Sequence, residues 1–151
     1  MDANVFATRI PKHFDLVYLD PPYNQHPYAS NYFMLNTIVD SRLGKDLSRI
    51  SGIPADWNRS DYNKKDKIKK SLTELISNLD ASYVVISYNN TGFITKKQMI
   101  NMLKEHGDVT IKTIPYHSYC YKSRKKTGIN NAVEEYLFVL HKNIQQISDA
   151  A

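Results

Sequence analysis

Residues 14–23 read Phe-Asp-Leu-Val-Tyr-Leu-Asp-Pro-Pro-Tyr, and this stretch decides the fold prediction. Its first six residues are mostly apolar and include aromatic and β-branched types, which favours a buried strand over a helix. The prolines that follow have no backbone N–H to give to a sheet, so they end the strand. We therefore expect a strand over Phe14–Leu19, with the segment Asp20–Tyr23 at its carboxyl end.

The remaining residues alternate between helical and strand patterns. Helices are expected over Tyr32–Val39, over Lys64–Leu79, and from Thr95 to a stop signal at Gly107. Strands are expected over Ser82–Ser87, Val109–Tyr121 and Glu135–His141, with a turn at Tyr88–Asn90 and loops at Ser41–Asn63 and Lys122–Asn131. Strands that alternate with helices predict an α/β fold with a mainly parallel sheet. The last two strands have no helix between them, so they can pair as an antiparallel end hairpin.

Composition limits the classes of protein that fit. The chain of 151 residues suffices for one domain, and its net charge of +5 is compatible with a polyanionic partner without requiring one. The single cysteine, Cys120, excludes an internal disulfide and a cysteine-based zinc site, and the scattered histidines predict no metal site. No apolar run could cross a bilayer and the first residues do not resemble a signal peptide, so we expect a cytoplasmic protein that does not contact membranes.

The segment Asp20–Tyr23 suits the alkylation of an exocyclic amine on an aromatic ring. Ligands of open α/β sheets gather at the carboxyl ends of the strands. There the Asp20 carboxylate and the Pro21 carbonyl can accept the two N–H bonds of such an amine and free its lone pair. Pro21 and Pro22 fix the backbone, and Tyr23 offers a ring for stacking. A simpler interpretation is that Asp-Pro-Pro only ends the strand.

Three stretches resemble Dam-like adenine-N6 DNA methyltransferases of restriction-modification systems. LVYLDPPYNQHPYASNYFMLNT at 16–37 is similar to their catalytic segment, VVISYNNTGFI at 84–94 to their next core segment, and VEEYLFVLHK at 133–142 to their closing strand. The matches occur in family order. The resemblance implies a Rossmann-like methyltransferase sheet that uses S-adenosylmethionine as methyl donor and a flipped adenine of double-stranded DNA as acceptor.

The resemblance also implies roles for single residues. Asp20 and Pro21 would hold the target amine, Tyr23 would stack on the base, and Asp2 and Asp20 would contact the cofactor. Further candidates for contacts to the base are Ser87, Tyr88, Asn89 and Tyr119, although an ordinary turn and plain strand packing explain these residues equally well. Candidates for contacts to DNA phosphates are Lys122, Arg124, Lys125 and Lys126, for which a solvated loop is the alternative.

One family feature is absent from the sequence. The glycine-rich cofactor turn of the family, Phe-x-Gly-x-Gly, has no counterpart, because all five glycines are isolated and follow the Asp20–Tyr23 segment. We therefore expect residues 1–142 to be the C-terminal, catalytic-loop half of a methyltransferase domain with an incomplete S-adenosylmethionine site, and residues 143–151 to be a polar tail. A truncated reading frame, a separate N-terminal half polypeptide or a trimmed piece would each produce such a chain. Alternative functions are methylation of RNA or protein amines and a non-catalytic remnant or interaction subunit.

Overall fold

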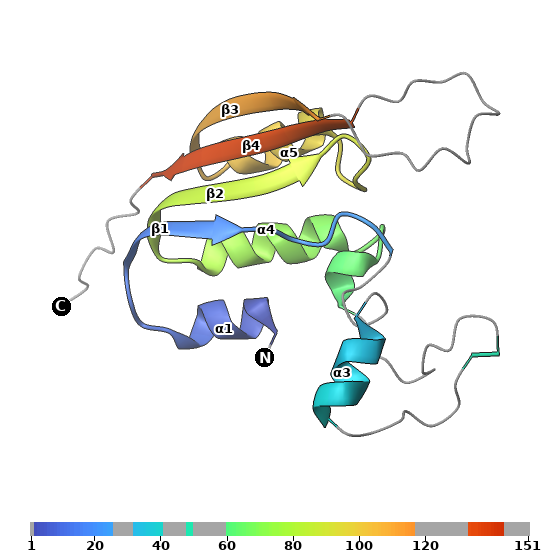
Figure 1. The fold of residues 1–151 in the computed structure, drawn as a ribbon. Coiled ribbons are helices and arrows are strands. Elements are labelled where there is room, and N and C mark those ends of the chain that lie inside the picture. The colour runs from blue at the N-terminus through green and yellow to red at the C-terminus, as the bar shows by residue number, and fades with distance from the viewer. Residues whose placement is uncertain (1, 26–31, 41–47, 50–59, 117–132, 144–151) are drawn as a thin grey trace, which may run out of the picture.

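The computed structural model describes residues 2–25, 32–40, 48–49, 60–116 and 133–143. Its elements, in chain order, are α1 (Ala3–Arg9), β1 (Phe14–Leu19), α3 (Phe33–Asp40), the short 3₁₀ helix η1 (Asp61–Asn63), α4 (Ile68–Asn78), β2 (Ala81–Asn89), α5 (Lys96–Lys104), β3 (Gly107–Tyr116) and β4 (Val133–Lys142) (Figure 1). The strand that precedes Asp20, β1, has the predicted bounds.

The strands form one sheet in the order β1-β2-β4-β3. β1 and β2 are parallel, and β4 runs antiparallel to both β2 and β3. Three of the strands therefore point the same way and only β4 is reversed. This confirms the predicted α/β sheet with an antiparallel end hairpin. β4 inserts between β2 and β3, an arrangement that the order of elements in the sequence does not reveal.

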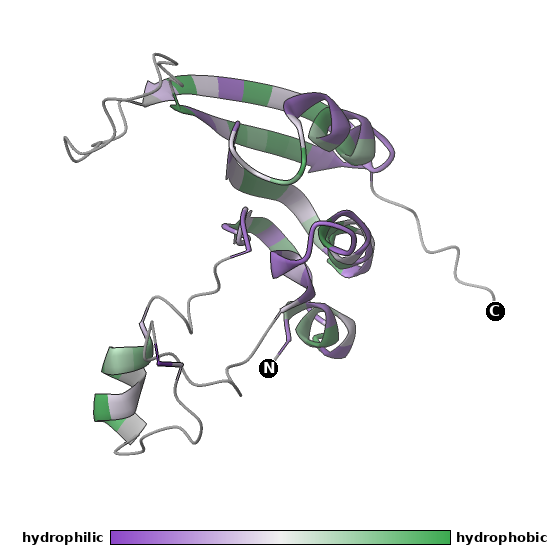
Figure 2. Ribbon diagram, turned by 90° about the vertical axis from the view of Figure 1, so that its right-hand side faces the viewer, coloured by the Kyte–Doolittle hydropathy of each residue, from purple (hydrophilic) through white to green (hydrophobic). Residues whose placement is uncertain are grey.

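The core lies between the sheet and two helices. α4 and α5 cover the same face of the sheet (Figure 2). At helical spacing, α4 buries Ile68, Leu72, Leu75 and Ile76, and α5 buries Met99, Met102 and Leu103. They meet strand residues that are completely buried, namely Val84, Ile86, Phe138 and Leu140. Each such side chain contributes about 1.5–3 kcal/mol by leaving water, so this layer holds the sheet together.

Helix α1 was not predicted. The Asp2 side chain caps it by accepting hydrogen bonds from the backbone N–H groups of Asn4 and Val5. The helix has seven residues and buries only Ala7, so it carries almost no periodic signal. It packs against α4, where the Asn4 amide donates to the Ser71 carbonyl at 2.8 Å. Tertiary contacts rather than local propensity therefore explain this helix.

Several predicted boundaries shift. α4 begins at Ile68 instead of Lys64, because residues 65–67 form a turn in which the Lys67 N–H donates to the Lys64 carbonyl. β2 runs to Asn89 through the predicted turn, since Tyr88 and Asn89 pair with Tyr136 and Glu135 of β4.

Gly107 opens β3 instead of merely ending a helix. It has a φ of 156°, and a Cβ there would lie 2.0 Å from the His141 carbonyl oxygen. The two strands of the hairpin thus approach too closely at this point for any other residue type.

Some predictions fall outside the described residues. They concern Tyr119, the basic residues Lys122, Arg124, Lys125 and Lys126, most of the loop at 41–63, and the tail from residue 144. Within the part that is described, no helix has the length and apolarity needed to span a membrane.

Candidate active site

The segment Asp20–Tyr23, which the sequence predicts to be catalytic and which we call the catalytic segment, begins where β1 ends. Asp20 follows Leu19 directly, and β2 ends beside it at Asn89. Because β1 and β2 are parallel neighbours, their carboxyl ends lie at the same edge of the sheet. The chain that follows β2 therefore reaches the chain that follows β1.

Two acceptors at this edge have no partner among the described residues. The Asp20 side chain is exposed and makes no hydrogen bond or ion pair there, and no described donor reaches the carbonyl oxygen of Pro21. Pro21 is buried, and its ring restricts the backbone dihedral φ at this point. A carboxylate and the rigid carbonyl of the next residue can each accept a hydrogen bond from one N–H of the same amino group.

The loop after β2 holds the catalytic segment in place. The Phe93 backbone N–H donates to the Tyr23 carbonyl oxygen at 3.1 Å. The rings of Tyr23 and Tyr88 meet edge to face, with centroids 6.3 Å apart and an interplanar angle of 84°. Tyr23 remains 38% exposed, so part of the residue is available to a ligand. We call these two contacts the Tyr23 brace.

Tyr88 lies behind Tyr23. Its side chain is 2% exposed, its hydroxyl accepts a hydrogen bond from the Ile94 N–H, and burial raises its pKa. A Cβ on Gly92 would lie 2.3 Å from the Tyr88 ring, so only glycine leaves room for that ring. This position suits a supporting role, and a direct contact of Tyr88 with a base stays a prediction.

Asn89 and Ser87 differ from Tyr88 in their surroundings. Asn89 is 5% exposed, and its side-chain oxygen accepts hydrogen bonds from the N–H (3.0 Å) and the hydroxyl (2.8 Å) of Thr91. These bonds shape the turn that leads to Phe93. Ser87 is half-buried and lies on the face of the sheet opposite to that of its neighbour Tyr88. Their predicted contacts with the base remain predictions.

An open cavity of about 930 Å³ adjoins the catalytic segment. Its described lining comes from four parts of the chain, namely residues 2–4, residues 18–22, residues 60–62, and residues 71, 72, 74 and 75. Asp2 and Asp20, which the sequence assigned to a cofactor, thus line the same cavity. Both hydrogen bonds by which Asp2 caps α1 use its Oδ1 atom.

Sequence reasoning missed the wall formed by Ser60, Asp61 and Tyr62. Tyr62 is 6% exposed and its hydroxyl donates to the side-chain oxygen of Asn4 at 2.6 Å. Burial raises the pKa of Tyr62, with smaller contributions from nearby acidic groups. Its neighbour Asn63 donates to the Asn24 carbonyl at 2.9 Å, which ties this wall to the catalytic segment. The only feature of the sequence that could have indicated this wall is Ser60, whose side chain caps η1.

Acidic side chains dominate the charge of the cavity. Asp2, Asp20, Asp61 and Glu74 line it, and among the residues that the structure describes no lysine or arginine belongs to the lining. The negative charge of Asp61 is balanced by Lys64, whose Nζ lies 2.7 Å from the carboxylate. The hydrogen bond from Lys64 lowers the pKa of the Asp61 carboxyl. The remaining carboxylates favour a ligand that carries positive charge.

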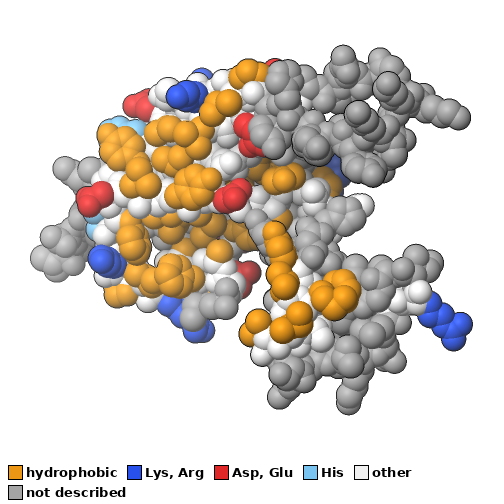
Figure 3. All heavy atoms as spheres, viewed as in Figure 1, with side chains coloured by type: hydrophobic (Ala, Val, Ile, Leu, Met, Phe, Trp, Pro, Cys, Tyr) orange, Lys and Arg blue, Asp and Glu red, His pale blue; other side chains and the backbone are white. Residues whose placement is uncertain are grey.

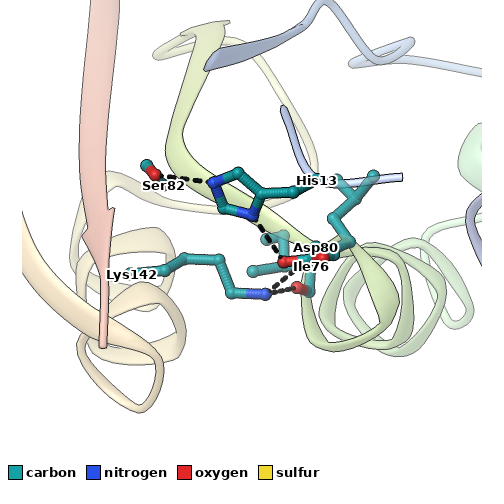
Figure 4. Close-up of polar contacts among 6 residues, drawn as sticks. His13, Ile76, Asp80, Ser82 and Lys142 are labelled. Atoms are coloured by element: carbon teal, nitrogen blue, oxygen red, sulfur yellow. Dashed lines mark hydrogen bonds and ion pairs between the residues drawn. The ribbon is translucent and has the colours of Figure 1, made fainter. Parts of the chain in front are cut away.

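A second polar cluster lies at the opposite end of the strands (Figure 4). His13 precedes β1, and its ring bridges Asp80 at 2.8 Å and Ser82 at 2.9 Å. Lys142 donates to the carbonyls of Ile76 and Leu79 at the C-terminus of α4. These contacts join the start of β1, the α4–β2 connection and the end of β4, so we assign this cluster to stability.

Comparisons with known proteins match most of the chain. A family profile described as D12 class N6 adenine-specific DNA methyltransferase matches residues 2–102. The chain is 36% identical over 148 residues to the modification methylase StsI of Streptococcus sanguinis, covering 93% of this chain and 21% of that protein. It is 29% identical over 139 residues to the type II methyltransferase M.CviAII of Paramecium bursaria Chlorella virus 1, covering 91% of this chain and 40% of that protein.

A third relative is the type II methyltransferase M.NlaIII of Neisseria lactamica. It is 30% identical over 144 residues, which cover 93% of this chain and 41% of that protein. The chain therefore spans between about a fifth and two fifths of the length of these relatives. No solved structure matches it.

Proposed function

The chain belongs to the D12 class of N6 adenine-specific DNA methyltransferases, and from this premise we propose that it supplies the catalytic loop of an enzyme that methylates the N6 amino group of adenine in DNA. The observation that carries the proposal is a pair of acceptors at the carboxyl end of β1, the Asp20 carboxylate and the Pro21 carbonyl, which have no partner in the described part of the chain. The Tyr23 brace keeps this segment in position.

The two acceptors address the weakness of adenine N6 as a nucleophile. The nitrogen lone pair is delocalised into the ring, so the amino group is planar and reacts poorly. Asp20 accepts one of its N–H bonds and Pro21 accepts the other, which draws the nitrogen toward tetrahedral geometry and frees the lone pair for in-line attack. Acceptors fixed before the reaction cost no reorganisation when it occurs.

The exposed ring of Tyr23 suits the acceptor base. A paired and stacked adenine cannot present N6 to Asp20, so the base must leave the duplex. The exposed part of Tyr23 can stack on the flipped base while its ring keeps the edge-to-face contact with Tyr88. In this proposal Ser87, Asn89 and Tyr119 contribute to the pocket, and the basic residues Lys122, Arg124, Lys125 and Lys126 contact DNA phosphates.

The cavity fits S-adenosylmethionine as cofactor. This molecule carries a sulfonium and an ammonium group, and when bound it supplies an electrophilic methyl group. The described part of its lining holds carboxylates and no lysine or arginine, and the volume of the cavity lies within the usual range of roughly 300–1,000 Å³ for ligand pockets. We assign Asp2 and Asp20 to this cofactor, on the sides of the cavity formed by α1 and by the end of β1.

Part of the cofactor site comes from outside these residues. The sequence has no glycine-rich turn, and the relatives extend well beyond the matched segment. We propose that residues 1–142 form the catalytic-loop half of the domain and that a glycine-turn half, on the same or a separate polypeptide, completes it. The chain alone should then bind S-adenosylmethionine weakly or not at all.

The substrate class can be tested with both halves present. The chain is mixed with the portion of M.NlaIII that lies outside the matched segment, which supplies the missing half, and with S-adenosylmethionine labelled on its methyl group. Duplex DNA, RNA and a protein mixture are offered in parallel, and the labelled DNA is digested to nucleosides. We expect label in duplex DNA as N6-methyladenine.

Two results would contradict this proposal. Label in RNA or protein but not in DNA would move the enzyme to another substrate class. If this mixture labels no substrate while the same halves of M.NlaIII label DNA, the chain is a non-catalytic member of the family.

A further inference from the structure

Buried polar side chains are few in the described part of this chain. Apart from tyrosines, the only buried residues there that carry one are Asn63, at 8% exposure, and Asn89, at 5%. The surface offers no comparable signal, because charged side chains are scattered over the face shown in Figure 3 and hydrophobic ones gather over the strands. A buried amide costs free energy unless its hydrogen bonds are made, so the partners of these two asparagines indicate their roles.

Both asparagines support the same short stretch of chain. Asn89 shapes the turn that leads to Phe93. The Phe93 N–H donates to the Tyr23 carbonyl at 3.1 Å. The Asn63 side chain donates to the carbonyl of Asn24, the next residue, at 2.9 Å. Two consecutive carbonyls are therefore held from two different elements, the loop after β2 and the short helix η1.

The helix η1, which carries Asn63, is itself firmly held. The Asn63 backbone N–H donates to the Ser60 carbonyl at 3.1 Å, and the Ser60 side chain caps the helix. The Tyr62 hydroxyl lies 2.6 Å from the side-chain oxygen of Asn4 in α1 and 3.3 Å from the Ser71 carbonyl in α4. An amide on such a support can fix the position of its partner instead of moving with it.

The same helix also forms part of the cavity. Asp61 and Tyr62 line the cavity that we assign to the cofactor, and Asn63 follows them directly. One turn of 3₁₀ helix thus contributes both a wall of the cavity and an anchor for the chain that follows Tyr23. The anchor therefore holds the catalytic segment in a fixed relation to the cavity wall. Methyl transfer is sensitive to this relation, because a misplacement of about 1 Å can cost roughly 10²-fold in rate.

We propose that Asn63 is a positioning residue for methyl transfer, an inference that rests on the proposed function. By holding the Asn24 carbonyl, its amide keeps Asp20 and Pro21 where they can accept the N–H bonds of the target amine. In this proposal Asn63 touches neither the base nor the cofactor and acts only through the catalytic segment. The competing explanation is that Asn63 only fills space in the wall. The two explanations differ in the effect of removing the donor while the volume is kept.

The first test measures amide hydrogen exchange in the purified chain. Asn63→Leu keeps most of the side-chain volume and lacks the donor, and Asn63→Ala is the second variant in case the larger side chain prevents folding. The control Leu140→Val trims a completely buried side chain that pairs near the start of β2, away from the catalytic segment.

The exchange rate of the Phe93 N–H is compared with the rates of the β2 amides, so that a general loss of stability cancels in the ratio. We expect this ratio to rise at least tenfold in the Asn63 variants and to keep its wild-type value in Leu140→Val. An unchanged ratio in the Asn63 variants, or an equal rise in the control, would overturn the proposal.

The second test measures single-turnover methyl transfer to duplex DNA at saturating cofactor and DNA. The chain is mixed with the portion of M.NlaIII that lies outside the matched segment. Asn63→Leu should be slower than wild type by about 10–10²-fold, with its affinities for DNA and cofactor within about twofold, and Leu140→Val should equal wild type. An Asn63→Leu rate within about twofold of wild type would overturn the proposal, as would a loss confined to either affinity.

The two measurements separate this inference from the proposed function. Hydrogen exchange is measured on the chain alone, without cofactor or DNA. If Asn63→Leu releases the Phe93 amide but the wild-type mixture methylates no DNA, the result counts against the proposed function and not against the anchor at Asn63.

Discussion

The backbone N–H of Phe93, in the loop that follows β2, donates a hydrogen bond of 3.1 Å to the carbonyl oxygen of Tyr23, in the segment that follows β1. Seventy residues of chain separate the two, and the parallel pairing of β1 and β2 brings them together. This bond, with the edge-to-face contact of Tyr23 and Tyr88, explains how a short segment without regular structure can hold two acceptors in fixed positions.

The Gly92→Ala substitution should break this support. The added Cβ would lie 2.3 Å from the Tyr88 ring, and overpacking of this kind typically costs about 1–3 kcal/mol. Urea unfolding should show a loss of that size, whereas Lys97→Ala on the exposed side of α5 should have little effect. The Gly92→Ala/Tyr88→Leu double variant should be no less stable than Tyr88→Leu alone, because the smaller side chain removes the clash. If Gly92→Ala costs as much stability in the Tyr88→Leu background as in wild type, the steric explanation is refuted.

Lys142→Met should destabilise the C-terminus of α4. The Lys142 ammonium donates to the carbonyls of Ile76 and Leu79, which otherwise lack intrahelical donors. Removing the ammonium leaves the two carbonyls partly buried without this donor and deletes a favourable charge at a helix C-terminus. We expect the free energy of unfolding to fall by about 1–3 kcal/mol. The exposed Lys69→Met on α4 is the matched control, and unfolding by urea compares the two. Indistinguishable midpoints would show that Lys142 contributes nothing through these bonds.

His106 should make stability fall at mildly acidic pH. Burial, aided by the positive charge of Lys142, holds the pKa of His106 below its ordinary value of 6.5. The unfolded chain therefore takes up a proton on this residue at a higher pH than the folded chain. The resulting stability is present above about pH 6.5 and is lost as the pH falls through the lower pKa of the folded state. Its Nε2 atom is buried and has no hydrogen-bond partner in the described part of the chain, so no acceptor there compensates the charged ring.

The test compares wild type with His106→Gln at pH 7.5 and pH 5.5. Other groups titrate in both proteins, so only the difference between them reports on His106. Wild type should lose more stability than the variant between the two pH values. An identical loss in both proteins would mean that His106 does not couple to folding.

The sequence was sufficient to predict the elements with strong local patterns. The strand Phe14–Leu19 and the amphipathic face of α4 follow from the spacing of apolar residues, and the capping box of Thr95 and Gln98 marks the start of α5. Chemistry at Asp20 and Pro21 could be proposed because the two residues adjoin at a strand end.

Features that depend on distant partners could not be predicted. Tyr88 and Asn89 look like a turn in sequence, and only their pairing with β4 keeps them in the strand. Tyr62 belongs to a segment without periodicity, and its place in the cavity depends on the side chain of Asn4, 58 residues earlier. The buried position of Tyr88 behind Tyr23 likewise required the fold.

The central claim is that the Asp20 carboxylate holds the amine that is methylated. The most direct test is the single-turnover rate of methyl transfer to duplex DNA by the chain combined with the glycine-turn half, for wild type, Asp20→Asn and the control Asp108→Asn on β3. Asparagine keeps the size of the side chain but replaces one acceptor oxygen with a donor. We predict a loss of roughly 10²–10³-fold for Asp20→Asn, with DNA binding unchanged and the Asp108→Asn rate equal to that of wild type. An Asp20→Asn rate within a few-fold of wild type would contradict the account.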